Sequence, residues 1–443
     1  MFAARSRMNR SNRSILGLNE DKVAAHRTRT LWLIGVLHAF THLYGVALLP
    51  LYLEIQRDFG LPGVEQATLL VTVIGLAYFI PSYVLGVMAD RFNRTRLLSI
   101  GLITNALGFI LIAVSPGYGW AIAGAALSGF GGSFYHPAAT ALTVQLFPEA
   151  RGRALGLVGI GASVGFFFGP VYSGWRAGAG SGWRAPVLEL GLLGLVAAAI
   201  FLALVREAPA RQPGAEVNRD GRVPAQAMFP TAALWLFFVC SALLFSLRDF
   251  AGSAMGTSAS LFFQKAHGFG TSLTGLALSG IFIASAVSNP LFGRLSDRGR
   301  IRWLSALLLL AALLMFLFPR VPATWSVPVL LAYGFFFMAS YPVTEAALME
   351  AVPDAVRGRV FGLFITICGL IGNVAHWAMG DWVGSMGAGA SQPSAYYPLY
   401  SMLALLVLAS LGALPFLRGI RKREHLEVPS GAGALPLAGF PEL

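Results

Sequence analysis

Apolar runs of about 20 residues recur along the whole chain, and a bilayer core requires a run of this length from a helix that crosses it. Only 12% of the 443 residues are charged, whereas soluble domains carry roughly 25%. Glycine is spread through the apolar runs, as is common where membrane helices approach closely. The sequence therefore predicts an all-α membrane protein.

The apolar runs divide into twelve predicted transmembrane helices, six in residues 31–206 and six in residues 231–417. Three polar segments flank them: a disordered N-terminal arm at 1–30, a linker at 207–230 and a tail at 418–443. The predicted spans are 31–54, 67–89, 96–115, 119–146, 152–175, 185–206, 231–264, 272–294, 302–319, 325–351, 358–384 and 396–417.

The basic residues are distributed unequally between the two sides of the predicted membrane. The side that holds both termini carries 26 Lys and Arg residues, the other side carries five, and Arg248 lies inside a span. Cytoplasmic loops carry such an excess, so we expect a multi-pass protein of the cell (inner) membrane with its arm, linker and tail in the cytoplasm. The net charge of +12 is thereby explained without a nucleic-acid partner.

The two halves of the chain repeat each other. The charged loop at 86–96 recurs at 293–302, with Gly86 and Asp90 matched by Gly293 and Asp297, 207 residues later. Two further segments repeat at offsets of 205 to 206: 147–156 as 352–362, and 135–137 as 340–342. This pattern predicts two pseudo-symmetric six-helix halves around a central cavity, with a substrate site between them near the bilayer midplane.

A twelve-span chain with Gly-x-x-x-Asp-Arg after span 2 and its repeat after span 8 resembles the major facilitator superfamily. Three segments resemble the fosmidomycin-resistance type of efflux protein: 38–44, 131–137 and 165–170. The resemblance implies efflux by alternating access. One position departs from it, because the resembling family tends to carry an acid where this chain has His42. A proton-coupling role that the resembling family would give to this acid therefore cannot be transferred to this chain.

The charged loops form a predicted cytoplasmic gate. A carboxylate docked at a helix N-terminus with Arg nearby makes a charge-assisted contact, and the resemblance implies that Asp90 reaches the start of span 11 and Asp297 the start of span 5. The alternative is that these charges only set topology. The gate residues are Gly86, Asp90, Arg91, Arg94, Arg151, Arg153, Gly293, Asp297, Arg298, Arg357 and Arg359.

Ionisable groups at membrane depth are costly and indicate function by default. Arg248 and Asp249 lie mid-span; since neighbours on a helix diverge by about 100°, we expect each to have a partner on another helix. Arg248 could attract an anionic substrate group, or the two could form a structural ion pair. Glu345 is the candidate coupling acid.

His38 and His42 share one helix face. They could exchange a proton or contact substrate, bind a metal, or only pack, and we assign no metal site because their spacing does not gather the further ligands needed. The complete candidate set for substrate or proton binding is His38, His42, Tyr44, Tyr135, His136, Arg248, Asp249, Tyr341, Glu345 and His376.

Span 5 carries a glycine stripe that includes Gly165 and Gly169 and is followed by Pro170. It resembles the antiporter signature of the superfamily, although ordinary close packing of small residues would also explain it. Motifs for phosphate binding or hydrolytic catalysis are absent from the sequence, so we expect neither an enzyme nor a cofactor.

Together these patterns predict a monomeric secondary active transporter that exchanges protons for a small organic compound and exports it. An anionic or a drug-like compound would fit the prediction. The alternatives are a proton-coupled uptake symporter for an organic acid or sugar, a metal exporter, and a non-transporting membrane sensor of the same fold.

Overall fold

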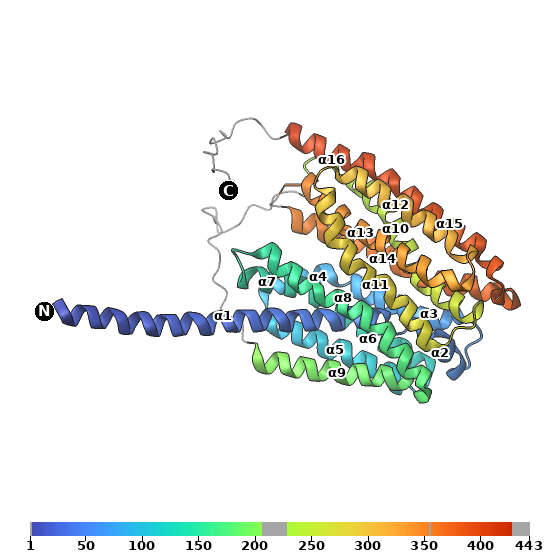
Figure 1. The fold of residues 1–443 in the computed structure, drawn as a ribbon, viewed down its shortest axis with the longest axis horizontal. Coiled ribbons are helices and arrows are strands. Elements are labelled where there is room, and N and C mark those ends of the chain that lie inside the picture. The colour runs from blue at the N-terminus through green and yellow to red at the C-terminus, as the bar shows by residue number, and fades with distance from the viewer. Residues whose placement is uncertain (1, 206–227, 354–355, 428–443) are drawn as a thin grey trace.

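The computed structural model describes residues 2–205, 228–353 and 356–427. Over these residues the regular elements are helices (Figure 1). The first half contains α1 (Phe2–Val46), α2 (Tyr52–Asp58), α3 (Val64–Phe79), α4 (Ser82–Arg91), α5 (Arg94–Val114), α6 (Tyr118–Gly132), α7 (Tyr135–Leu146), α8 (Arg151–Arg176) and α9 (Arg184–Leu204). The second half contains α10 (Ala232–Lys265), α11 (Thr271–Ser296), α12 (Arg300–Leu317), α13 (Ala323–Ala351), α14 (Arg357–Ser385), α15 (Tyr397–Ala409) and α16 (Ala413–Glu427).

These helices form the twelve predicted spans in two six-helix halves, which confirms the predicted fold class. Within the described part of the chain, ten segments are long and apolar enough to cross a membrane. The other two spans are each broken into two helices, α3 with α4 and α6 with α7. Pro81 separates the first pair, because proline has no backbone N–H to donate within a helix. The second break follows Gly131 and Gly132 and precedes Pro137.

The structure describes the N-terminal arm from Phe2 onward, but only parts of the linker and of the tail. The N-terminal arm was predicted to be disordered, but α1 already begins at Phe2; the Ala, Arg and Leu residues of this arm favour helix. Most of the predicted linker (206–227) and the end of the tail (428–443) lie outside the described residues.

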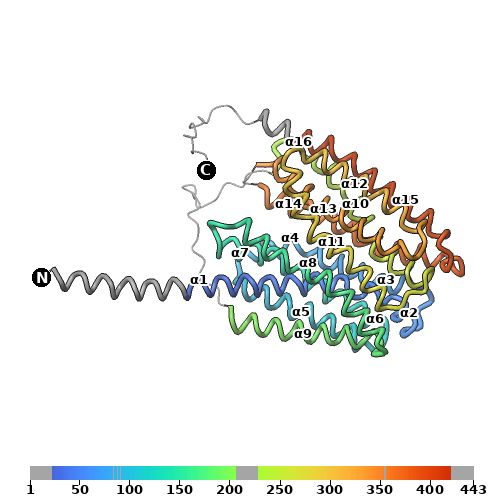
Figure 2. Tube along the Cα trace, in the orientation of Figure 1, coloured from blue at the N-terminus to red at the C-terminus, as the bar shows by residue number. Residues whose placement is uncertain are grey.

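The two halves pack closely at the end of the bundle that lies away from the termini (Figures 1 and 2). There α8 meets α11 and α3 meets α14. The Ser279 hydroxyl donates to the Phe167 carbonyl at 2.7 Å, and the Thr72 hydroxyl donates to the Asn373 carbonyl at 2.9 Å. A Cβ placed on Gly174 would lie 2.4 Å from the Thr271 carbonyl oxygen, so only glycine allows this approach. We call this the packed end.

At the opposite end, near the termini, the halves diverge (Figure 1). Gly152 and Gly156 of α8, and Gly358 and Gly362 of α14, have no atom within 4 Å of the position that a Cβ would take. The predicted gate loops belong to this end, which we call the open end.

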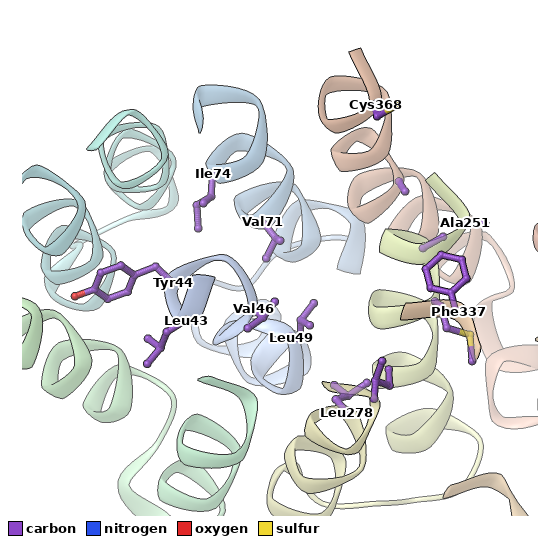
Figure 3. Packing of buried hydrophobic residues seen from close by; sticks show 14 of the residues in the cluster. Leu43, Tyr44, Val46, Leu49, Val71, Ile74, Ala251, Leu278, Phe337 and Cys368 are labelled. Atoms are coloured by element: carbon purple, nitrogen blue, oxygen red, sulfur yellow. The ribbon is translucent and has the colours of Figure 1, made fainter. Parts of the chain in front are cut away.

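Apolar side chains fill the interior of each half. Figure 3 shows Tyr44 of α1 directed away from the second half, and its hydroxyl donates to the Leu190 carbonyl of α9 at 3.0 Å. The Tyr44 ring packs on Phe109 of α5, with centroids 4.5 Å apart. These contacts fix α1 against the outer helices of its own half and so position its polar face.

Candidate functional site

Three histidines of the first half come together, and we call them the histidine triad: His38 and His42 of α1, and His136 of α7. Their ligand nitrogens all lie within 4.8 Å of one another. The Nε2 atoms of His38 and His42 are 3.1 Å apart. His38 is buried, whereas His42 and His136 are half-buried. The sequence left the grouping of these residues open; the structure joins all three.

Neighbouring side chains orient the triad. The His38 Nδ1 atom lies 2.9 Å from the Val158 carbonyl oxygen of α8, so Nδ1 carries the proton and Nε2 is free to accept. The Tyr135 ring stacks on His38 with centroids 4.6 Å apart, and the Phe166 ring lies 4.4 Å from that of His42. The imidazoles are therefore held in place by packing as well as by hydrogen bonding.

A second polar group lies in the other half, and we call it the arginine cluster: Arg248 and Asp249 of α10, and Tyr341, Thr344 and Glu345 of α13. Arg248 is only 1% exposed. Its guanidinium lies 2.7 Å from Asp249 Oδ1 and donates to the Thr344 hydroxyl at 2.8 Å. The Tyr341 ring lies 4.2 Å from the guanidinium carbon.

We expected Arg248 and Asp249 each to have a partner on another helix. For Asp249 this expectation is wrong. Although their Cβ atoms diverge, the long arginine side chain folds back, and both its Nε and an Nη atom contact the same Asp249 oxygen. Arg248 does reach a partner on another helix, Thr344. The charge of Arg248 is thus neutralised in this state.

Glu345 is the exposed member of the arginine cluster. It lies six residues before the end of α13, within electrostatic reach of Arg248 and Asp249, and its side chain is exposed. The pair beside it is already neutralised, so Glu345 is the exposed acidic group of the cluster.

Two predicted candidates lie apart from both clusters. Tyr44 comes two residues after His42, so it points to the opposite side of α1, and it belongs to the core. His376 is buried in α14, where its Nδ1 lies 2.7 Å from the Thr257 hydroxyl. That hydroxyl lies 3.0 Å from the Tyr52 hydroxyl of the first half. His376 therefore belongs to a hydrogen-bonded chain that joins the halves.

The gate residues gather at the open end. Asp297 is 64% exposed and pairs with Arg300 at 3.1 Å, and Arg300 also contacts Glu350 at 2.5 Å. The Asp90 side chain lies outside the described residues. The crossed contacts predicted for Asp90 and Asp297 concern a state in which this end is closed, so they stay a prediction.

Three of the remaining gate arginines make hydrogen bonds within their own half. Arg94 donates to Gln145 Oε1 at 2.5 Å, Arg151 to the Pro148 carbonyl at 3.1 Å and Arg357 to the Val352 carbonyl at 3.2 Å. Arg91, Arg153, Arg298 and Arg359 are exposed. Gly86 and Gly293 have no atom within 4 Å of a Cβ position.

The glycine stripe of α8 lies against α1. A Cβ on Gly165 would lie 2.0 Å from the Ala39 carbonyl oxygen, and one on Gly169 would lie 3.0 Å from the Leu43 carbonyl oxygen. The stripe brings α8 close enough for Val158 to reach His38. Pro170 adds a contact between the halves, since its carbonyl would lie 2.2 Å from a Cβ on Gly275.

Sequence reasoning missed Thr344, and it missed the chain of Tyr52 and Thr257 with His376. Thr344 could have been found, because it lies three residues after Tyr341 and so shares its helix face. The chain could not, since its members come from three helices distant in sequence.

A family model described as "Major Facilitator Superfamily" matches residues 31–376. "Multidrug resistance protein 2" of Bacillus subtilis is 23% identical over 366 residues, which cover 81% of this chain and 90% of that protein. "Multidrug resistance protein B homolog" of Mycobacterium tuberculosis is 33% identical over 232 residues, 51% of this chain but only 38% of that protein. "Quinolone resistance protein NorA" of Staphylococcus aureus is 25% identical over 218 residues, 49% of this chain and 53% of that protein.

Among solved structures, the fold resembles a bacterial homologue of the human lysosomal transporter Spinster, described as inward-facing and unoccupied. The TM-score is 0.73 at 17% identity, over 92% of this chain and 99% of that one.

Proposed function

We propose that this chain, which belongs to the Major Facilitator Superfamily, exports a small organic compound in exchange for protons. Membership makes the chain a multi-pass membrane transporter. Relatives named for multidrug and quinolone resistance support export. Both termini lie in the cytoplasm in this proposal, so the open end faces the cytoplasm.

The observation that carries the proposal is the exposed carboxylate of Glu345 beside a neutralised ion pair. Arg248 is already occupied by Asp249, so Glu345 is the group that can hold either a proton or a positively charged or polar part of the cargo. Binding of one then excludes the other, and that exclusion is what exchange requires. The cargo favoured by this arrangement is cationic or neutral rather than anionic.

The packed end and the open end indicate how this transporter would alternate access between the two sides of the membrane. In the state described, cargo enters from the cytoplasm at the open end. The halves then rock, the packed end separates, and the gate loops close. Closure would bring Asp297 from Arg300 to the start of α8, and Asp90 to the start of α14, where helix N-termini attract carboxylates.

Reconstituted vesicles test the exchange. Thermal-shift screening of fluoroquinolones, organic acids and divalent metals would select the cargo, and an imposed pH gradient would drive it. We expect cargo to move against the protons and to stop moving in Glu345→Gln. Cargo that moves in the same direction as the protons would contradict exchange.

The ion pair between Arg248 and Asp249 favours a second candidate function, proton-coupled uptake of an organic anion. Protonation of Asp249 would free Arg248 for a carboxylate, so proton and anion would bind together. The same vesicles distinguish the two, because only this candidate predicts co-directional movement that Asp249→Asn uncouples.

Cysteine labelling can test whether the gate residues close the open end. With Cys240 and Cys368 replaced by serine, a cysteine at Gly156 reports access at the open end. If the crossed contacts hold this end shut, Asp90→Asn and Asp297→Asn will each increase the labelling rate. An unchanged rate in both variants would leave the charges with a topological role only.

A further inference from the structure

The proposed exchange uses the arginine cluster and leaves the histidine triad unexplained. Three imidazoles at membrane depth are costly unless they are used. We infer that His38, His42 and His136 bind a divalent ion of the late first-row transition metals, for which Zn²⁺ is the reference. This inference does not rest on the proposed export, and it stands or falls with metal binding alone.

The distances within the triad fit one shared ion. A tetrahedral Zn²⁺ with Zn–N bonds of about 2.0–2.1 Å holds its ligand nitrogens about 3.3 Å apart. The Nε2 atoms of His38 and His42 are already 3.1 Å apart. The His136 nitrogen lies within 4.8 Å of both, so a rotation of that ring, on the half-buried side of the site, completes the set.

The contact from His38 to α8 is the kind that supports a metal ligand. Metal-binding histidines usually donate their second ring N–H to a carbonyl or carboxylate, which fixes the tautomer. The His38 Nδ1 donates to the Val158 carbonyl at 2.9 Å. The lone pair of Nε2 therefore points toward His42, and stacking on Tyr135 holds the ring plane.

The Tyr78 ring packs edge-on against His136, with centroids 6.1 Å apart. Its hydroxyl oxygen is buried and makes no hydrogen bond within the described part of the chain. Three imidazole nitrogens suit Zn²⁺, Co²⁺ or Ni²⁺ better than Mg²⁺ or Ca²⁺.

The charge of the site predicts the remaining ligand. Neutral imidazoles leave the ion with its full +2 charge, and desolvating such a charge is costly. The triad includes no carboxylate. An anionic fourth ligand, either hydroxide or a chelating oxygen of a bound compound, would offset this cost. His42 and His136 are half-buried, so this fourth position can be reached.

Metal binding can be measured on the full chain in detergent, purified without a polyhistidine tag. Equilibrium dialysis against buffered Zn²⁺ with elemental analysis gives the stoichiometry, and the visible absorption of Co²⁺ reports tetrahedral nitrogen ligation. We expect one saturable ion per chain. His42→Asn and His136→Asn should each weaken binding by more than about tenfold, since even a residue that only supports a ligand is worth 10–100-fold.

His376→Asn is the matched control, because His376 is also a buried transmembrane histidine but lies outside the triad; it should bind Zn²⁺ as the unaltered chain does. Size-exclusion profiles would identify variants that fail to fold. The inference is overturned if the unaltered chain shows no saturable Zn²⁺ or Co²⁺ binding. It is also overturned if folded His42→Asn and His136→Asn keep the ion, or if His376→Asn loses it.

Discussion

The histidine triad and the arginine cluster occupy corresponding places in the two halves but have different chemistry. His42 and Arg248 are 206 positions apart, and His136 and Tyr341 are 205 apart, which are the offsets of the internal repeat. In the first half these positions hold neutral ring nitrogens within 4.8 Å of one another. In the second half they hold a buried guanidinium paired with a carboxylate at 2.7 Å.

The difference shows that the repeat preserves where polar side chains lie without preserving what they do. The triad has donors for a soft cation and no charge of its own. The arginine cluster has its charges paired, except for the exposed carboxylate of Glu345. Each half therefore carries a different kind of polar group at the corresponding place.

The largest expected difference between the clusters is in stability. Arg248→Leu leaves the half-buried Asp249 carboxylate without its ion-pair partner, and breaking a buried ion pair in this way costs roughly 3–5 kcal/mol. At the corresponding position, His42→Leu removes one hydrogen bond and should cost only about 0.5–1.5 kcal/mol. Reversible unfolding in mixed micelles would compare the two variants.

The double variant Arg248→Met with Asp249→Leu is the control, since it leaves no unpaired charge and should recover much of the loss. If Arg248→Leu and His42→Leu lower the free energy of unfolding equally, the pair of Arg248 and Asp249 is not desolvated as described.

The next effect is on transport. Glu345→Gln should bring gradient-driven movement of cargo down to the level of empty vesicles, because the amide cannot exchange a proton. Glu350→Gln lies in the same helix, but its carboxylate contacts Arg300, so this variant should keep most of the transport. Normal transport by Glu345→Gln would place the exchanging group elsewhere.

A smaller effect is expected where the halves are joined. Thr257→Val removes both hydrogen bonds that link Tyr52 to His376, and each hydrogen bond contributes about 1 kcal/mol. Because this link forms only when the packed end is closed, its loss should favour opening of that end. Labelling of a cysteine near Gly174 should become faster, and unchanged labelling would show that the chain does not hold the end shut.

The smallest effect is expected at Tyr44→Phe. Its hydroxyl donates to the Leu190 carbonyl within the first half, so its loss should cost about 0.5–1.5 kcal/mol. Transport and Zn²⁺ binding should be unchanged, because the ring points away from the triad. A change in either measurement would indicate that α1 is positioned through this contact.

Much of the fold could be predicted from the sequence, because twelve apolar runs and a repeat of about 206 residues leave few arrangements. The breaks in spans 2 and 4 could not, since they depend on the local backbone geometry near Pro81 and Pro137. His38 and His42 could be paired from helical spacing. Their contact with His136 depends on how closely the glycines of α8 let α1 approach, and spacing alone does not carry that information. The direct pairing of Arg248 with Asp249 depended on rotamers in the same way.

Exchange at Glu345 is tested most directly by counting protons. A cargo selected by thermal shift would be added to the purified chain in weakly buffered detergent near neutral pH, and the pH change recorded. Exchange predicts that cargo binding releases protons, and that Glu345→Gln releases none while still binding. Proton uptake on binding, or a release that persists in Glu345→Gln, would contradict it.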